Sequence, residues 1–251
     1  MALEISFKGK HVLVTGAGNG IGLALCEKLW SGGAHVVALD KCDQSLDKLV
    51  AKCPGVVPVC VDLLDWEGTR LALNEVLNEP LHGLVNNAGI GGAATFMKTT
   101  PAILDPVIGL NVKAIVNVSQ VVVGQAIAAG RGCNIVNVSS LASRFPTRAS
   151  CPYNLSKAGV DMLTKSMAFE LGRHKIRVNS VNPNIVMTAL AEEWMRAGDG
   201  AVLKGKLVGR TPLGRVGAVS EVVDTILFLL SDSAPMIHGQ SVFVDGGFSA
   251  A

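Results

Sequence analysis

Short apolar runs alternate with longer segments of mixed polarity along this chain of 251 residues. The runs are rich in valine, leucine and isoleucine, and most of them end at a glycine or a polar residue. Such runs are typical of strands that are buried on both faces of a sheet. They predict strands at 10–15, 35–39, 56–61, 83–85, 134–138, 177–181 and 241–244.

Segments between these runs have helical character. The sequence predicts helices at 23–30, 65–77, 111–129 and 219–230. Another helix is expected to begin near Ser150 and Pro152, because serine and proline favour the start of a helix. The segment at about 188–210 contains glycines and has no clean period. We predict that it is a mobile loop with short helices, of the kind that closes over a bound ligand.

Strands and helices alternate from one end of the chain to the other. The sequence contains no linker, charge block, low-complexity tract or internal repeat. Strands joined in this way form a parallel sheet with helices on both faces. The pattern therefore predicts an α/β fold with a doubly wound, seven-stranded parallel sheet, and one domain spanning residues 1–251.

Composition narrows the range of partners. Hydrophobic residues make up 49% of the chain, which fits a sheet covered on both faces or a large subunit interface. The net charge is only +2 and aromatic residues are 4%, so no nucleic-acid partner is expected. No unbroken apolar run reaches the roughly 18 residues that a membrane span needs. We therefore predict no transmembrane segment.

Cysteine and histidine usage argues against a disulfide framework and a metal site. The six cysteines lie far apart without a C-x-x-C pair, and the five histidines are scattered. The first residues, Met1 to Glu4, lack the basic and apolar regions of a signal peptide. These features predict a reduced intracellular compartment, the cytoplasm.

The first predicted strand runs directly into a glycine-rich turn, Gly16 to Gly22, and then into a helix. The glycines permit a tight turn and a close backbone approach, so that helix N–H groups and the helix dipole can meet a pyrophosphate. Many glycine triplets are ordinary turns. In this strand-to-helix setting we interpret the turn as a phosphate-binding site.

Asp40 and Lys41 follow the second predicted strand, where the ribose of a bound dinucleotide lies in this type of fold. A carboxylate there accepts a hydrogen bond from a 2′-hydroxyl and repels a 2′-phosphate. A lysine can attract that phosphate. The two residues thus favour NAD and NADP respectively, and the choice stays open at this point.

Two later strand ends carry further candidates. Asp62 follows the third strand and could hold the adenine edge, and Asn87 precedes the small residues Ala88 and Gly89, which permit backbone approach to a cofactor. A plain loop with asparagine-rich turn chemistry is the alternative.

Tyr153 is the only tyrosine of the chain, and Lys157 lies four residues after it. On a helix the two side chains project from one face, one turn apart. Such a pair is usually a solvated surface contact. A nearby fixed cation, however, favours the phenolate and lowers the pKa of the phenol from about 10 towards the range of acid–base catalysis. The pair is therefore a candidate for handing a proton to an oxygen atom.

The chain resembles the short-chain dehydrogenase/reductase family, whose fold is of the Rossmann type, from end to end. The motifs that carry the resemblance are Thr15-Gly16 with Gly20 and Gly22, Asn86-Asn87-Ala88-Gly89, Asn111, Ser140, Tyr153 and Lys157. They occur in the order and spacing of the single-domain members. The resemblance implies hydride transfer between a nicotinamide ring and a carbonyl or alcohol carbon.

The resemblance also implies a role for each catalytic candidate. Tyr153 would protonate the carbonyl oxygen, and Ser140 would hydrogen-bond the same oxygen. Lys157 would lower the pKa of the phenol and bind the nicotinamide ribose. Asn111 would anchor a water that leads protons away from Lys157.

Three further segments resemble the dicarbonyl/L-xylulose reductases within this family: Pro58 to Glu67, His174 to Asn179 and Val186 to Thr188. That resemblance implies NADPH-dependent reduction of α-dicarbonyls and of L-xylulose to xylitol, by a homotetramer. Two residues depart from that pattern. Asn19 stands where such NADPH users place a basic residue in the glycine turn, and Asp40 stands at the strand end just before the position of their arginine. Lys41 occupies the arginine's position. NADP(H) is favoured, and NAD(H) stays possible because of Asp40.

The predicted site follows from these motifs. The cofactor residues are expected to be Gly16, Asn19, Gly20, Ile21, Gly22, Asp40, Lys41, Asp62, Leu63, Asn87, Ala88, Gly89, Tyr153, Lys157, Pro183, Val186 and Thr188. The substrate, a small carbonyl compound, is expected to contact Ser140, Leu141, Cys151, Tyr153, Asn184, Met187 and Trp194. Packing alone is the alternative for the substrate residues other than Ser140 and Tyr153. Asn184 replaces a common family glycine, and Cys151 suggests a thiol-sensitive activity.

Two alternatives remain at this stage. Asp40 would suit an NAD-linked alcohol dehydrogenase that works in the oxidative direction. A catalytically silent cofactor-binding scaffold is the other alternative, although a binding role makes no demand on Tyr153.

Overall fold

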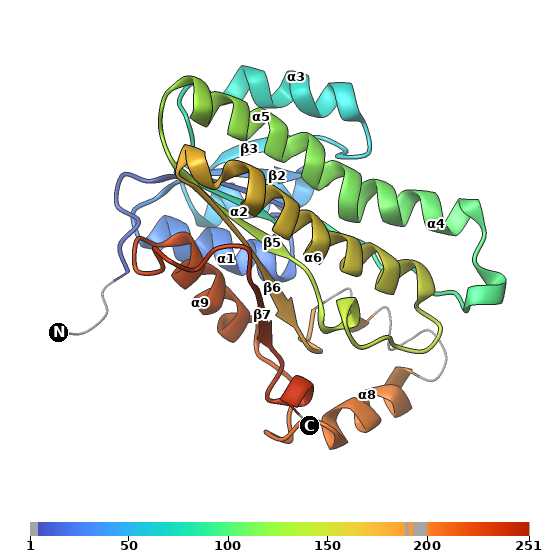
Figure 1. The fold of residues 1–251 in the computed structure, drawn as a ribbon. Coiled ribbons are helices and arrows are strands. Elements are labelled where there is room, and N and C mark those ends of the chain that lie inside the picture. The colour runs from blue at the N-terminus through green and yellow to red at the C-terminus, as the bar shows by residue number, and fades with distance from the viewer. Residues whose placement is uncertain (1–4, 189–190, 193–199, 251) are drawn as a thin grey trace.

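Seven strands form one parallel sheet in the computed structural model, which describes residues 5–188, 191–192 and 200–250. Within these residues the strand order is β3-β2-β1-β4-β5-β6-β7 (Figure 1). The strands are β1 (His11–Thr15), β2 (His35–Asp40), β3 (Val57–Cys60), β4 (Gly83–Asn86), β5 (Cys133–Val138), β6 (Ile176–Pro183) and β7 (Ser241–Val244). The predicted doubly wound sheet is confirmed.

Helices cover both faces of this sheet (Figure 1). The helices are α1 (Gly20–Ser31), α2 (Asp43–Lys52), α3 (Trp66–Val76), α4 (Pro101–Ile108), α5 (Ala114–Ala128), α6 (Cys151–Leu171), α8 (Gly200–Gly209) and α9 (Val219–Leu230). Helices α1, α2 and α9 pack on one face, and α3, α5 and α6 pack on the other. Helix α2 was not predicted from the sequence.

Side chains of β1 alternate between the two halves of the core. Val12 and Val14 pack into the cluster formed with α1 and α9, whereas Leu13 packs into the cluster formed with α3 and α5. All three are fully buried. This is why the strand reads as a continuous apolar run rather than as an alternating pattern.

The helix predicted at 111–129 begins ten residues earlier, at Pro101. Helix α4 continues through a π-helical turn (η2, Gly109–Lys113) into α5. The earlier start was missed because a π turn inserts an extra residue and shifts the apolar stripe, so the two halves share no single helical period. The predicted start lies inside that turn, at Asn111.

The combined helix Pro101–Ala128 is long and apolar enough to cross a membrane by length and composition alone. The sequence shows no unbroken apolar run because Asn111 and Lys113 interrupt it. Half of its most apolar window is buried inside the fold, and α5 contacts β4, β5 and α3. Burial of this kind is typical of a core helix.

The segment predicted as a mobile loop, 188–210, lies partly outside the described residues. Trp194 is among the residues outside them. The described part contains α8. Closure of this segment over a ligand stays a prediction.

The chain reverses its winding direction between β1 and β4, which are neighbours in the sheet. In open parallel sheets the crevice at the carboxyl ends of two such strands is where ligands bind. The residues at and after these strand ends, together with those after β5 and β6, therefore define the candidate site.

Candidate active site

Hydrogen bonds join the loops after β1 and β4 at the point where the winding reverses. The Thr15 hydroxyl accepts hydrogen bonds from the backbone N–H groups of Asn87 and Ala88, at 3.0 and 3.1 Å. The Asn87 amide donates to the backbone oxygens of Thr15 and Gly16, at 3.0 and 3.1 Å. Thr15 and Asn87 thus fix the floor of the crevice.

The glycine turn has no space for side chains. A Cβ atom on Gly22 would lie 2.1 Å from the backbone oxygen of Gly16, and one on Gly16 would lie 2.8 Å from the Cα of Ala88. Helix α1 starts at Gly20, and the side chain of its N-cap residue Asn19 does not cap it. The first N–H groups of α1 are therefore left for a phosphate, which the helix dipole also favours.

Asp40 braces the same turn. Its carboxylate accepts hydrogen bonds from the backbone N–H groups of Gly18 (2.9 Å) and Cys42 (3.0 Å). Lys41 beside it is exposed. Asp62, at the end of the neighbouring strand, accepts from the N–H of Leu64 in a local turn. The structure thus gives Asp40 a role in shaping the glycine turn that the sequence did not reveal.

Asn111, in the π turn, is fully buried. Its side-chain oxygen accepts from the N–H of Ile90 (2.9 Å), and its amide donates to the backbone oxygen of Ile90 and the hydroxyl of Ser156, both at 2.9 Å. A Cβ atom on Gly89 would lie 3.1 Å from Asn111 Oδ1 and 3.6 Å from Lys157 Nζ. Asn111, Gly89 and Lys157 therefore converge, and the π turn lies at the site, as such turns often do.

Lys157 is buried on α6, one turn after Tyr153. Its ammonium donates to the backbone oxygen of Val138 at 2.8 Å and lies 5.6 Å from the centroid of the Tyr153 ring. Burial lowers the pKa of Lys157 to about 8, although the charge of Asp161 acts in the opposite direction. A cation held at this distance can stabilise negative charge on the phenol.

Burial raises the pKa of Tyr153, and its hydrogen bond with Ser140 opposes that shift. The sequence-based expectation that the neighbouring lysine lowers this pKa is therefore wrong for the protein on its own, since desolvation of the phenolate dominates. The raised pKa makes the phenol a weaker acid than a free tyrosine, so release of its proton depends on stabilisation of the phenolate by Lys157.

These motifs match a known family. The sequence model of the family described as short chain dehydrogenase matches residues 10–198. The chain belongs to the short-chain dehydrogenase family.

Curated relatives of this short-chain dehydrogenase span its length. The chain is 46% identical to an L-xylulose reductase from Bos taurus, covering 99% of this chain and 100% of the relative. It is 43% identical to a D-erythrulose reductase from Gallus gallus, covering 99% of both chains. The chain is thus an NAD(P)-dependent oxidoreductase.

Solved structures show the same fold. A gluconate 5-dehydrogenase from Burkholderia cenocepacia in complex with NADP has a TM-score of 0.90 and 30% identity, covering 98% of both chains. A 3-ketoacyl-(acyl-carrier-protein) reductase from Brucella melitensis complexed with NADH has a TM-score of 0.88 and 30% identity, covering 97% of this chain and 100% of that one. A nicotinamide cofactor fits the crevice, whose glycine turn and uncapped helix start suit a pyrophosphate.

The predicted cofactor residues of this short-chain dehydrogenase lie at or after the ends of β1, β2, β3, β4 and β6, and on α6. Besides the contacts above, a Cβ atom on Gly20 would lie 3.2 Å from the side chain of Thr188. Pro183 pairs with Val244 of β7, and Val186 forms a bridge with Gly217. The loop after β6 thus reaches the glycine turn.

The substrate candidates are gathered less completely. Leu141 is buried beside Ser140 in the turn η3 (Leu141–Ser143), which packs on α6. The Asn184 amide donates to the hydroxyl of Thr211 at 3.2 Å, while its Oδ1 is buried without a partner among the described residues. Met187 is exposed. The unpaired Oδ1 of Asn184 is suited to accept a hydrogen bond from a ligand hydroxyl.

Cys151 begins α6 and is partly exposed. Its backbone N–H donates to the oxygen of Ala94 at 3.0 Å, which ties the loop after β4 to the start of α6. The thiol sensitivity of the activity stays a prediction.

Sequence reasoning assigned no role to three residues that support the site. The Thr15 hydroxyl joins two loops, and the Ser156 hydroxyl accepts a hydrogen bond from the Asn111 amide. Asp161 accepts two hydrogen bonds of 3.0 Å from the Asn182 amide and keeps charge on Lys157. The signal for Asp161 was present in the sequence, because a carboxylate four residues after a lysine lies on the same helix face.

Proposed function

We propose that this short-chain dehydrogenase is an NADPH-dependent carbonyl reductase that acts on α-dicarbonyls and reduces L-xylulose to xylitol, with Tyr153 as the proton donor. The observation that carries the proposal is the convergence of Tyr153, Ser140 and Lys157 beside the crevice, with the Lys157 ammonium 5.6 Å from the Tyr153 ring and Ser140 hydrogen-bonded to the phenol. The relatives named L-xylulose reductase support the substrate class.

Reduction needs a hydride and a proton. The nicotinamide, when bound, supplies the hydride to the carbonyl carbon. The Tyr153 hydroxyl gives its proton to the carbonyl oxygen as negative charge develops there, and Ser140 donates a hydrogen bond to the same oxygen. The Lys157 ammonium stabilises the phenolate that remains.

In this scheme Asn111 mainly holds neighbouring segments of the chain in place. Both hydrogens of its amide are used, by Ile90 and Ser156. A water that carries protons away from Lys157 would therefore have to donate a hydrogen bond to the side-chain or backbone oxygen of Asn111. We propose that its first role is to hold the loop of Gly89 against α6.

Cofactor preference depends on Asp40 and Lys41. A carbonyl reductase from Sus scrofa that is 43% identical carries NADPH in its name, and Lys41 offers a cation for the 2′-phosphate. Asp40 opposes this choice and favours the alternative of an NAD-linked alcohol dehydrogenase. We propose NADPH because both carboxylate oxygens of Asp40 are already hydrogen-bonded to the backbone.

Replacing Asp40 by alanine should raise the ratio of kcat/KM for NADPH to that for NADH, because a charge that repels the 2′-phosphate is removed. The affinity for both cofactors should fall, since Gly18 and Cys42 lose their acceptor. Steady-state kinetics with both cofactors measure the ratio. Asp43→Ala, which removes an exposed carboxylate from the start of α2, is the control and should leave the ratio unchanged. An unchanged ratio in Asp40→Ala would refute this placement of the side chain.

Substrate and cofactor are tested together by comparing kcat/KM for NADPH and NADH over L-xylulose, D-erythrulose, diacetyl and a simple secondary alcohol. We expect the highest values for reduction of a ketose or diketone by NADPH. Faster oxidation of the alcohol with NAD would favour the alcohol dehydrogenase. Tight cofactor binding without any turnover would instead identify a scaffold.

We also propose that the protein is a homotetramer. Helix α6 presents three exposed apolar side chains, Leu155, Met162 and Phe169, at seven-residue intervals, and Phe169 is 93% exposed. This helix lies beside α4 and α5 on one face of the molecule (Figure 1). Exposed apolar side chains that share one helix face in this way mark interaction surfaces.

Phe169→Lys should shift the protein from a tetramer to a smaller species in sedimentation velocity experiments, because it places a charge in the proposed interface. Leu71→Lys, which replaces an exposed apolar residue on α3, should not change the sedimentation coefficient. A monomeric wild-type protein would contradict the proposal.

A further inference from the structure

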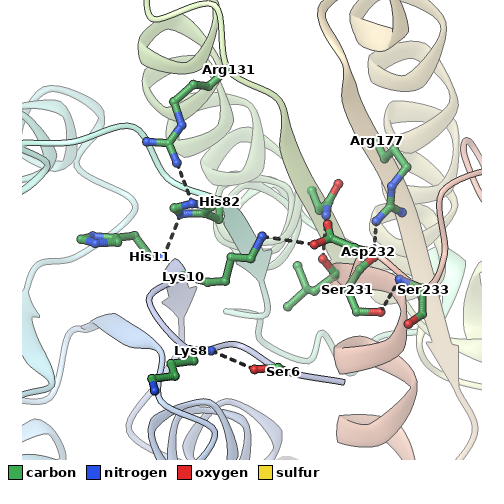
Figure 2. Close-up of polar contacts among 12 residues, drawn as sticks. Ser6, Lys8, Lys10, His11, His82, Arg131, Arg177, Ser231, Asp232 and Ser233 are labelled. Carbon is green, nitrogen blue, oxygen red and sulfur yellow. Dashed lines mark hydrogen bonds and ion pairs between the residues drawn. The ribbon is translucent and has the colours of Figure 1, made fainter. Parts of the chain in front are cut away.

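A second polar pocket lies at the opposite edge of the sheet from the candidate active site, at the amino ends of the strands. Its volume is about 200 Å³, and its lining includes Lys10, His82, Lys175 and Asp232. Lys10, His82 and Lys175 directly precede β1, β4 and β6, respectively, and Asp232 follows α9. Figure 2 shows the Lys10 ammonium between His82 and Asp232.

His82 cannot satisfy both of its polar neighbours. The backbone N–H of His11 donates to its Nδ1 at 3.0 Å, and Nη2 of Arg131 lies 2.6 Å from its Nε2 (Figure 2). Both neighbours are donors, whereas a neutral imidazole has one acceptor nitrogen and one N–H. In either tautomer, one N–H group faces another N–H group. An acceptor is therefore missing at this position.

The charge around His82 is positive. Burial lowers the pKa of His82, and the charges of Arg131 and Lys10 lower it further. Among the residues that the structure describes, Arg131 has no ion pair with a carboxylate. The nearest pairs at this edge are Lys10 with Asp232 (3.2 Å) and His11 with Glu79 (3.9 Å).

Arg177 at the same edge, shown in Figure 2, is explained by the fold. It donates to the backbone oxygens of Leu229, Ser231 and Ile237, and so caps the end of α9. Within the described part of the chain, Arg131 has no comparable set of acceptors. The basic character around His82 is thus not fully accounted for by helix capping.

We propose that this edge of the sheet binds a phosphate group, held by His82 and Lys10, which line the pocket, and by Arg131, which does not line the pocket but contacts His82 beside it. With the His82 proton on Nε2, its Nδ1 keeps the bond from His11, and a phosphate oxygen accepts from both His82 and Arg131. Arginine and phosphate form strong, charge-assisted hydrogen bonds. Lys10 joins when Asp232, whose side chain is 83% exposed, turns outward.

The size of the pocket limits the ligand to a small oxyanion. Pockets that take drug-sized molecules measure roughly 300–1,000 Å³, so about 200 Å³ suits a phosphate or a small phosphate ester. The cofactor crevice lies at the carboxyl ends of the strands, so both sites can be occupied together.

Calorimetric titration with inorganic phosphate tests the proposal, at constant ionic strength set with chloride. The protein is titrated alone and after saturation with NADPH, which blocks phosphate binding at the glycine turn. We expect one saturable site per chain that persists with NADPH present. Arg131→Gln should weaken this site at least about tenfold, because a charge-assisted hydrogen bond is lost. Lys8→Gln, which removes an exposed charge at the same edge, is the control and should bind as the wild type does.

A histidine NMR spectrum gives a second measurement that needs no variant. Phosphate should shift the ring nitrogen signals of His82 and leave those of His174 and His238 unchanged. No saturable binding in the presence of NADPH, equal affinity in wild type and Arg131→Gln, or an unshifted His82 signal would each overturn the proposal. The difference between wild type and Arg131→Gln does not depend on cofactor specificity or turnover, since Arg131 and His82 lie outside the cofactor crevice.

Discussion

Replacing Tyr153 by phenylalanine is expected to lower kcat for ketone reduction by about 10²–10⁴-fold. The substitution removes only the hydroxyl, so the ring keeps its place on α6 and its distance of 5.6 Å from the Lys157 ammonium. Removal of the proton donor leaves the developing alkoxide with the hydrogen bond from Ser140 alone. Steady-state kinetics with NADPH and L-xylulose measure the loss.

Cofactor affinity and folding serve as internal controls for this variant. The dissociation constant for NADPH, measured by fluorescence titration, should change little, because the glycine turn and the Asn87 contacts are untouched. The melting temperature should fall by at most a few degrees, since the phenol hydroxyl has one described hydrogen bond, with partly exposed Ser140. Retained turnover would remove Tyr153 from the proton-transfer step.

Replacing Lys157 by methionine is expected to abolish most turnover and to change the pH dependence of stability. Burial lowers the pKa of Lys157 to about 8 in the folded protein, whereas its ordinary value is 10.5. Between these values the unfolded chain binds more protons, so the free energy of unfolding of the wild type rises with pH. Below about pH 8 both states are protonated, and the cost of burying the ammonium is fully present.

The free energy of unfolding of the wild type, relative to Lys157→Met, should therefore rise by on the order of 3 kcal/mol between about pH 8 and pH 10.5. Urea unfolding of both proteins at several pH values measures this difference, and titration of the other groups cancels in it. Lys165→Met, an exposed lysine on the same helix, should give a flat difference. A flat difference for Lys157→Met as well would mean that the amine is not desolvated.

The strands and the glycine turn could be predicted from the sequence because their signals are local. Val12, Leu13 and Val14 are apolar whichever face of the sheet they cover. The glycines between Gly16 and Gly22 indicate a tight turn by themselves. The extended start of the long helix at Pro101 could not be predicted in the same way, since the π turn around Asn111 breaks the period on which helix recognition depends.

The properties of the site that depend on burial could not be predicted from the sequence. The raised pKa of Tyr153 follows from desolvation, which a helix pattern does not reveal. Asp40 was expected only at the ribose, and its hydrogen bonds to Gly18 and Cys42 arise because the turn after β1 folds back over the end of β2. The misfit of Arg131 and His82 likewise involves residues 49 positions apart.

Transfer of deuterium from NADPH labelled at C4 to the product tests the proposed reaction most directly. Incubation of the wild-type protein with L-xylulose and this cofactor, followed by mass spectrometry, should yield xylitol that carries deuterium at the reduced carbon, and Tyr153→Phe should yield very little. Binding of NADPH without labelled xylitol, or equal yields from the two proteins, would contradict reduction by hydride transfer with Tyr153 as the acid.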